Sequence, residues 1–327
     1  MNLPDLLKEA IEREARSIEQ STLSQASQEL TKRYRDQSQR QHIMRKQERF
    51  VNNAAQRIAY VLARMPATYE AVYSILNELK DQIPFFFHSL LDVGAGPGTA
   101  TWAAATVFPD LVQAILLEQD ASLMDLGKKL SSGNSPALIK NAKWSQTNVL
   151  KEESFPSSDL TIVSYSMGEW PKSQWEEILN KLWKSTQKLL IIVEPGTMAG
   201  FQVISTARQY LIEQGAYMTA PCPHLLKCPM AQSDWCHFSA RIARSSLHRQ
   251  IKQGTLGHED EKFSYIAVSK NLVELPSARI IRHPKKHSGH INFKLCAHEG
   301  LIEKTISKRE GERYKEAKDL EWGNAFI

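Results

Sequence analysis

Long apolar runs are absent from this sequence of 327 residues. No stretch approaches the roughly 20 consecutive apolar residues that a membrane-spanning helix needs, which argues against an integral membrane protein. The opening residues, MNLPDLLKEAIEREAR, show neither the apolar core of a secretory signal nor the acid-poor character of a mitochondrial transit peptide. We therefore predict a cytoplasmic protein that has no membrane partner.

Cysteine is scarce: the chain has four, and all of them fall between positions 222 and 296. Cytoplasmic thiols stay reduced, so metal ligation is favoured over disulfides. The C-x5-C-x7-C spacing of the first three matches neither the C-x2-C zinc knuckle nor the bacterial ferredoxin run. Four thiolates suit an iron–sulfur cluster or a structural zinc ion, and buried free thiols are the third interpretation. The candidate ligands are Cys222, Cys228, Cys236 and Cys296.

Glycine is also sparse, yet three glycines are concentrated in the segment LLDVGAGPGTA, at Gly94, Gly96 and Gly98. The dinucleotide fingerprint, G-x-G-x-x-G, would require its third glycine at position 99, where Thr99 stands. The G-x-G-x-G spacing after a strand is instead typical of S-adenosylmethionine (SAM) methyltransferases, because glycine lets the backbone bend and approach a ligand. A turn that serves packing alone, or that binds another nucleotide, is the alternative.

Two carboxylates accompany this glycine turn. Asp92 ends the preceding strand, where it could orient the methionine ammonium group of SAM. Glu118 closes the next predicted strand, where it could accept both ribose hydroxyls. The sequence therefore predicts a SAM site made by Asp92, the three glycines and Glu118.

Strand-like runs recur at residues 89–93, 112–118, 159–166 and 188–194, with helical stretches between them. This alternation predicts a doubly wound α/β architecture. Residues 5–80 carry apolar side chains at helical spacing, interrupted near Pro66, while the runs at 263–269, 278–283 and 291–297 predict antiparallel additions. We predict a helical region at 1–85, a SAM-binding core at 86–215, and a metal-ligating part at 216–327 that includes the last strands of the sheet.

The acceptor side of the predicted pocket lacks a familiar motif. The fourth strand runs into SYSMGEW, and not into the N/D-P-P-Y string that grips an exocyclic base nitrogen. The candidate acceptor contacts are Tyr165, Ser166 and Glu169, although Glu169 could equally cap the helix that follows.

Positive charge is unevenly distributed. Residues 222–327 carry 18 Lys and Arg against 12 Asp and Glu, together with eight of the ten histidines, whereas residues 91–221 carry 10 against 13. This asymmetry predicts that the C-terminal part faces a polyanion, with a solvated surface as the alternative. A further basic segment, QRQHIMRKQERF, spans residues 39–50.

Several segments resemble one known family. They are RMPATYEAVYSIL (64–76), LLDVGAGPGTATWAA, SYSMGEW, VEPGTMAGFQVISTAR (193–208), PCPHLLKCPMAQSDWCHF (221–238), EDEKFSYIAVSK (259–270) and the late Cys296. Together they resemble the methyltransferase-like proteins of the mitochondrial small ribosomal subunit and their bacterial relatives, from about residue 50 to the end.

The resemblance implies a class I SAM-dependent methyltransferase fold and association with small-subunit ribosomal RNA during ribosome assembly. In mitochondrial members it also implies a 4Fe-4S cluster, and the family's four cysteine positions match Cys222, Cys228, Cys236 and Cys296. Two functions follow as hypotheses: a SAM-dependent RNA methyltransferase, or a non-catalytic assembly factor that keeps a SAM site. We expect a monomer when the protein is off the ribosome.

Two basic groups then become candidate RNA contacts. In HFSARIARSSLHRQIK the cationic residues recur at three- or four-residue spacing, which predicts one face of a helix. Three further cations precede Cys296 in RHPKKHSGH. The predicted phosphate contacts are Arg241, Arg244, Lys252, Arg282, Lys285 and Lys286.

Overall fold

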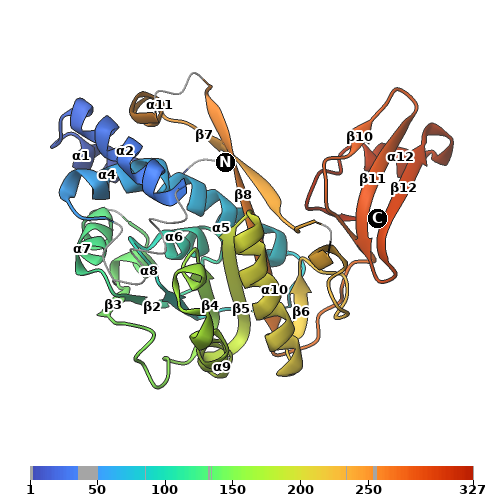
Figure 1. The fold of residues 1–327 in the computed structure, drawn as a ribbon, viewed down its shortest axis with the longest axis horizontal. Helices are drawn as coiled ribbons and strands as arrows, with labels where there is room; N and C mark the ends of the chain where they lie inside the picture. Colours follow the sequence, from blue (N-terminus) through green and yellow to red (C-terminus); the bar gives the residue numbers. More distant parts are fainter. Residues whose placement is uncertain are drawn as a thin grey trace.

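The computed structural model describes residues 3–35, 51–84, 86–131, 133, 135–232, 234–252 and 256–326, so the basic segment 39–50 lies outside the described residues. A large sheet covered by helices forms the body of the molecule, and a small second sheet forms a lobe at one end (Figure 1). No helix in the described ranges combines the length and the apolarity needed to cross a bilayer.

Among the described residues, four helices precede the large sheet: α1 (Asp5–Ala15), α2 (Gln20–Arg35), α4 (Ala54–Ala63) and α5 (Met65–Lys80). The side chain of Asn53 caps α4 by accepting a hydrogen bond from Gln56 N at 2.8 Å. Proline lacks an amide hydrogen and fits only the first turn of a helix, so the chain breaks between α4 and α5 and places Pro66 at the start of α5. The predicted interruption near Pro66 is confirmed.

The large sheet has eight strands. They are β1 (Ser89–Val93), β2 (Gln113–Glu118), β3 (Lys143–Gln146), β4 (Ser158–Ser164), β5 (Thr186–Pro195), β6 (Tyr217–Ala220), β7 (Phe238–Ala243) and β8 (His258–Ser269). Their order is β3-β2-β1-β4-β5-β8-β6, with β7 also paired to β8. Strands β1 to β5 pair in parallel, whereas β8 is antiparallel and lies between β5 and β6. This order is that of class I methyltransferases, which confirms the predicted fold class.

Helices cover both faces of this sheet because its strands are apolar on both sides. In β5, Leu189 and Ile191 pack toward one core, while Leu190 and Ile192 pack toward the other. The connecting helices are α6 (Thr99–Val107), α7 (Ala121–Leu130), α8 (Ala137–Lys140), α9 (Trp175–Ser185), α10 (Met198–Glu213) and α11 (Ser246–Lys252). Short 3-10 turns occur at Met167–Glu169, Lys172–Gln174, Pro229–Gln232 and Lys308–Glu310.

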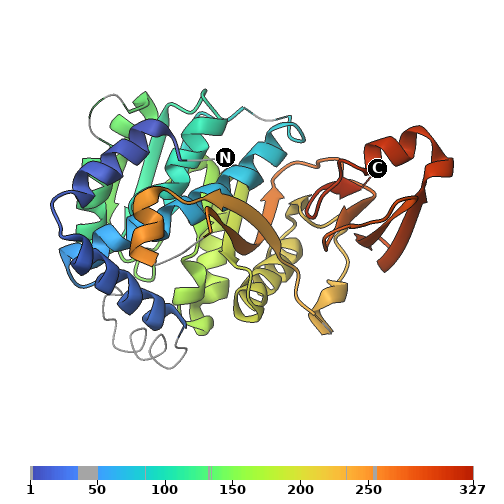
Figure 2. The ribbon, with the colours of Figure 1, turned by 90° about the horizontal axis from the view of Figure 1, so that it is seen from above.

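The second sheet contains β9 (Ala278–Ile280), β10 (Lys285–Lys286), β11 (His290–Ala297), β12 (Gly300–Ser307) and β13 (Ala325–Phe326). All of its pairings are antiparallel, with β11 bonded to β9, β10 and β12. Helix α12 (Glu312–Ala317) packs on one face of this sheet, and both views show the lobe standing beside the large sheet (Figures 1 and 2). The predicted antiparallel additions are confirmed, although the run at 263–269 joins the large sheet.

One predicted helix is wrong. The segment that contains Arg241 and Arg244 is not one face of a helix: Arg241 lies in strand β7, and α11 begins only at Ser246. Along β7 the side chains of Phe238, Ala240 and Ile242 are buried, which is the two-residue alternation of a strand. Pairing with β8, a segment twenty residues away, decides this conformation.

Candidate functional site

The glycine turn joins β1 to α6 in a left-handed conformation. Gly94, Gly96 and Gly98 have φ values of 69°, 56° and 83°, which side chains rarely adopt. A Cβ atom on Gly94 would lie 2.6 Å from Ser166 Cβ, so glycine is needed there for packing against the end of β4. A Cβ atom on Gly96 would meet no atom within 4 Å, so this part of the turn faces open space.

Glu118, at the end of β2, is fixed to the turn. Its Oε2 accepts a hydrogen bond from Gly96 N and its Oε1 accepts one from Asp120 N, both at 2.8 Å. Burial raises the pKa of Glu118, while these backbone donors act in the opposite direction. A carboxylate has about four acceptor positions, so these two hydrogen bonds leave acceptor capacity for a hydroxyl group of a bound ligand.

Asp92 lies buried beneath the turn. Its Oδ2 accepts hydrogen bonds from Thr101 Oγ1 at 2.7 Å and from Thr101 N at 3.2 Å. Its Oδ1 has no hydrogen-bond partner in the part of the chain that the structure describes. Burial raises the pKa of Asp92 to about 7. An unsatisfied, buried carboxylate oxygen beside a glycine turn fits a ligand that carries a cationic donor such as an ammonium group.

The acceptor candidates lie at the end of β4, where internal hydrogen bonds already engage two of them. Ser166 Oγ lies 3.1 Å from both Gly94 O and Ser164 O, to which it can donate, and so it supports the glycine turn. Tyr165 has a φ of 56°, alone among the non-glycine residues that the structure describes. Such strain persists only where surrounding contacts hold the residue in place. Glu169 ends the 3-10 turn that follows.

The contacts that hold Tyr165 come from β8 and from the corner between α4 and α5. The Tyr165 hydroxyl donates to Glu261 Oε1 at 3.2 Å, and Arg64 forms an ion pair with the same oxygen at 3.0 Å. Burial and the negative charge of Glu261 raise the pKa of Tyr165 well above its usual value. We call Arg64, Tyr165 and Glu261 the corner triad. No local sequence pattern indicates this triad, because the three residues come from separate parts of the chain.

Helix α4 also lies close to both sides of the site. Burial raises the pKa of Tyr60 to about 12, and the nearby charges that contribute include Arg64, Glu169 and Glu118. The negative charges of Glu169 and Glu118 raise the pKa of Tyr60 further, and the positive charge of Arg64 lowers it. Glu194, at the end of β5, accepts a hydrogen bond from Gly168 N at 3.0 Å and fixes the 3-10 turn.

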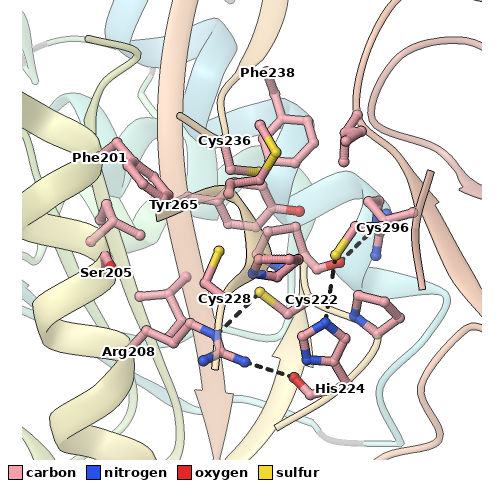
Figure 3. A pocket seen from close by; sticks show the side chains of 18 residues that line it. Phe201, Ser205, Arg208, Cys222, His224, Cys228, Cys236, Phe238, Tyr265 and Cys296 are labelled. Carbon is pink, nitrogen blue, oxygen red and sulfur yellow. Dashed lines mark hydrogen bonds between the residues drawn. The ribbon is translucent and has the colours of Figure 1, made fainter. Parts of the chain in front are cut away.

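The four cysteines line a single cavity of about 30 Å³ (Figure 3). Cys222 and Cys228 belong to the loop after β6, Cys236 stands two residues before β7, and Cys296 lies in β11 of the second sheet. Helix α10 closes one wall with Phe201 and Arg208. The structure therefore brings together thiols that are separated by up to 74 positions in the sequence.

The chemistry around these thiols is unusual for an apolar core. Burial, followed by the other three cysteines, raises the pKa of Cys236 well above its usual value. Burial raises the pKa of Cys296 to about 12. The buried guanidinium of Arg208 donates to Cys222 Sγ at 3.3 Å and to the carbonyl oxygens of His224 and Leu226 at 2.8 Å.

Histidine and a second arginine complete the cavity. His224 Nε2 lies 3.5 Å from Cys296 Sγ, whereas its buried Nδ1 has no partner among the described residues. Arg279 is buried, pairs with Glu78 and donates to Pro221 O at 2.8 Å. Four thiols suit a thiophilic metal in number and type. However, no three His, Cys, Asp or Glu side chains of the described residues are gathered as ligands around one ion.

Most of the predicted RNA contacts are engaged in ion pairs. Arg241 pairs with Asp260 at 2.9 Å and Arg244 pairs with Glu259 at 2.7 Å. Arg282 pairs with Asp234, and Lys286 pairs with Glu321 at 2.6 Å. Lys252 ends α11, and its side chain lies outside the described part. Lys285 is exposed and makes no ion pair with any residue that the structure describes.

Comparison with known proteins gives one matching family. The family described as "Mitochondrial small ribosomal subunit Rsm22" matches residues 54–327. Similar curated proteins are the mitochondrial ribosome assembly protein METTL17 of Homo sapiens, 26% identical over 289 residues, and the mitochondrial Rsm22-cox11 tandem protein 2 of Schizosaccharomyces pombe, 25% identical over 325 residues. The alignments cover 82% of this chain but only 61% and 43% of these relatives.

Solved structures give weaker likenesses. The magnesium protoporphyrin IX methyltransferase of Synechocystis with bound SAM has a TM-score of 0.40 and 9% identity, over 68% of this chain and 85% of that one. An O-methyltransferase family protein of Burkholderia thailandensis has a TM-score of 0.43 and 13% identity, over 54% of this chain and 59% of that one. The strand order, and not these likenesses, assigns the fold.

The predicted cytoplasmic localisation is corrected by the same comparisons. The matching family and both curated relatives are described as mitochondrial. The composition of the first sixteen residues, on which the prediction rested, therefore does not decide the compartment.

Proposed function

The chain belongs to the Rsm22 family, and from this premise we propose that it is a SAM-binding, methyltransferase-like protein that acts on or binds small-subunit ribosomal RNA during ribosome assembly. The observation that carries the SAM assignment is the unsatisfied Oδ1 of Asp92 beneath an open, left-handed glycine turn. The RNA assignment rests on the family and on the names of its ribosomal relatives.

The residues of the turn have distinct roles in this proposal. Asp92 would hold the ammonium group of the methionine part, and Glu118 would accept the ribose hydroxyls while it keeps its bonds to Gly96 and Asp120. Gly96 leaves the space through which the ligand approaches the backbone. When bound, SAM supplies an electrophilic methyl group. Methyl transfer needs chiefly positioning, so a dedicated acid or base is not required.

A non-catalytic assembly factor is the second candidate function, and the acceptor side favours it. The hydroxyls of Tyr165 and Ser166 are committed to Glu261 and to backbone carbonyl oxygens. The corner triad also ties the end of β4 to the α4–α5 corner, beside the place where an acceptor base would enter. In this case SAM would stabilise the fold without turnover.

For the cysteine cavity we propose a metal centre held by Cys222, Cys228, Cys236 and Cys296. A 4Fe-4S cluster is the first choice and zinc is the alternative. Arg208 would balance part of the thiolate charge, and His224, whose Nε2 lies 3.5 Å from Cys296 Sγ, would stand beside the centre. The centre would join the loop after β6 to the second sheet and would take no part in methyl transfer.

Two measurements test the proposal. Calorimetry on the purified protein should show SAM binding at a single site, and the absence of any binding would remove the SAM assignment. Mass spectrometry of ribosomal RNA from cells with and without the protein should then separate the two functions. A modified nucleotide that disappears supports the enzyme, whereas an unchanged modification profile with defective small subunits supports the assembly factor.

A further inference from the structure

The second sheet has one face that α12 leaves uncovered. Along β11 the side chains of Ile291, Phe293 and Leu295 are buried in the core beneath α12. Side chains alternate between the two faces of a strand, so His290, Asn292 and Lys294 point to the opposite side. We call this side the outer face. Cys296 stands on the same face, at the end of β11 that reaches the cysteine cavity.

The strand register extends this face across the neighbouring strands. Lys285 of β10 and Thr305 of β12 both lie opposite Asn292, and Ser307 lies opposite His290. Thr305 Oγ1 donates to Asn292 Oδ1 at 3.0 Å. Polar groups that can donate to a ligand therefore continue from strand to strand.

Two imidazole rings mark the far end of the outer face. His287 and His290 belong to the turn between β10 and β11, and their rings stack with centroids 4.5 Å apart and planes inclined by 16°. The hydrogen bond from His287 N to His290 O, at 2.9 Å, closes this turn. The backbone N–H of Lys308 donates to Gly289 O at 2.9 Å, which places the next 3-10 turn beside the imidazoles.

Positive charge predominates in this region, although Glu303 of β12 lies opposite Lys294 and pairs with it at 3.7 Å. Residues 283–309 carry six Lys and Arg against two acidic residues, a net of +4, and four histidines in addition. Lys285, Lys308 and Arg309 are exposed, and none of them forms an ion pair with a residue that the structure describes. This separates them from Arg241, Arg244, Arg282 and Lys286, whose charges are already paired.

We propose that the outer face binds a single-stranded segment of RNA. Lys285, Lys308 and Arg309 would contact phosphates, and the His287–His290 pair would stack on an unpaired base. The exposed pleat favours single-stranded RNA, because unstacked bases can lie on a sheet that carries rings, whereas a duplex hides its base faces. The inference rests on the proposed ribosomal RNA function and names the surface that performs it.

The test uses the full-length protein and a labelled, mixed-sequence oligoribonucleotide, either single-stranded or annealed to its complement. Replacing Lys285, Lys308 and Arg309 together by Gln should weaken single-strand binding about tenfold or more. The slope of log affinity against log salt should become less steep by about 2, since three phosphate contacts are lost and each contributes about 0.7. The variant His287→Ala with His290→Ala should weaken binding without changing this slope.

A charge-matched control lies on the other side of the same lobe. Arg313, Lys315 and Lys318 of the α12 region, replaced together by Gln, should leave RNA affinity unchanged. Calorimetric SAM affinity and the thermal midpoint check that each variant is folded.

The outcomes distinguish the surface from the function. If the two triple-Gln variants lose RNA affinity equally, or if the outer-face variants bind RNA as tightly as the wild type, the outer face is not the RNA-binding surface, although RNA binding itself stands. Equal binding of single strand and duplex would overturn the single-strand assignment. A wild-type protein that ignores RNA, but sediments with small subunits only when the outer face is intact, would assign the face to a ribosomal protein instead. A wild type that binds neither RNA nor subunits would overturn the proposed function as well.

Discussion

At the scale of single residues, Asp92 links the fold to its ligand. The carboxyl is fully buried, and burial raises its pKa from 3.8 to about 7. The unfolded chain therefore loses this proton near pH 4, whereas the folded, ligand-free protein keeps it until about pH 7. The carboxyl thus contributes stability that is lost as the pH rises between these two values, by roughly 4 kcal/mol at most.

A ligand cation should reverse this preference, because it stabilises the ionised form of Asp92. We expect SAM affinity to rise about tenfold between pH 6 and pH 8. Calorimetry in buffers of different ionisation enthalpy should show proton release on binding near pH 6. Asp92→Asn should weaken SAM binding and flatten the pH dependence of both affinity and stability. An unchanged pH profile in this variant would mean that another group holds the ammonium.

Two glycines of the same turn should respond differently to one added methyl group. In Gly94→Ala the new Cβ would collide with Ser166, so we expect a loss of stability of several kcal/mol. In Gly96→Ala the Cβ would enter open space, so only the cost of the positive φ, about 1 kcal/mol, should appear in the unfolding free energy. SAM affinity should nevertheless fall in Gly96→Ala. Chemical denaturation of both variants measures the change in unfolding free energy, and calorimetry measures the change in SAM affinity. Together they separate a loss of packing from a block on the approach of the ligand.

The glycine turn was predictable because its signal is local: three glycines, a strand before them and a helix after them. The partners of Asp92 and Tyr165 were not. Thr101 reaches Asp92 from the first turn of the next helix, and Glu261 reaches Tyr165 from 96 positions further along the chain. The contact with Thr101 depends on the path of the turn between β1 and α6, and the contact with Glu261 depends on how β8 inserts into the sheet. Single-sequence patterns record neither.

At the scale of elements, the corner triad fastens helix α4 to strand β8. Glu261→Gln removes the charge that Arg64 and Tyr165 share, so we expect an unfolding free energy lower by roughly 1–3 kcal/mol. Hydrogen exchange across α4 should quicken in this variant.

The neighbouring residue on β8 supplies the control for this prediction. Asp260 pairs with Arg241, and both side chains are more than 40% exposed. Asp260→Asn should therefore change the unfolding free energy by less than about 0.5 kcal/mol. Equal effects of the two substitutions would show that the triad adds nothing beyond a surface ion pair.

Strand β7 shows why the element boundaries were harder to predict than the elements. Arg241, Arg244 and His248 have helical spacing, while Phe238, Ala240 and Ile242 have strand spacing, and both patterns fall within residues 238–248. The segment forms a strand because its apolar alternation lets it pair with β8. Arg241 then forms an ion pair with Asp260, and Arg244 forms one with Glu259. A short segment with both periods is decided by its neighbours.

At the scale of the whole molecule, the cysteine cavity lies where the second sheet meets the body. Protein purified without oxygen should contain about four iron atoms per chain and absorb broadly in the visible range. Cys296→Ser should lose the metal and lower the thermal midpoint, because the centre ties β11 to the loop after β6. Ser205→Ala changes a neighbouring wall of the same cavity and should retain the metal. One zinc atom per chain and no iron would decide for the alternative.

Strand β8 has a consequence for how this chain is made. It lies between β5 and β6, although β6 comes earlier in the sequence, and its pairing of Val268 with Leu190 spans 78 positions. In a nascent chain that has not yet emerged past residue 269, one edge of β5 therefore stays unpaired and β6 lacks its partner strand. Long-range pairing of this kind is slow, and open edges invite association between incomplete chains. We therefore expect translation that stalls before β8 to yield aggregates. Chaperones that protect this protein during synthesis must cover the strand edge that stays unpaired until β8 is made.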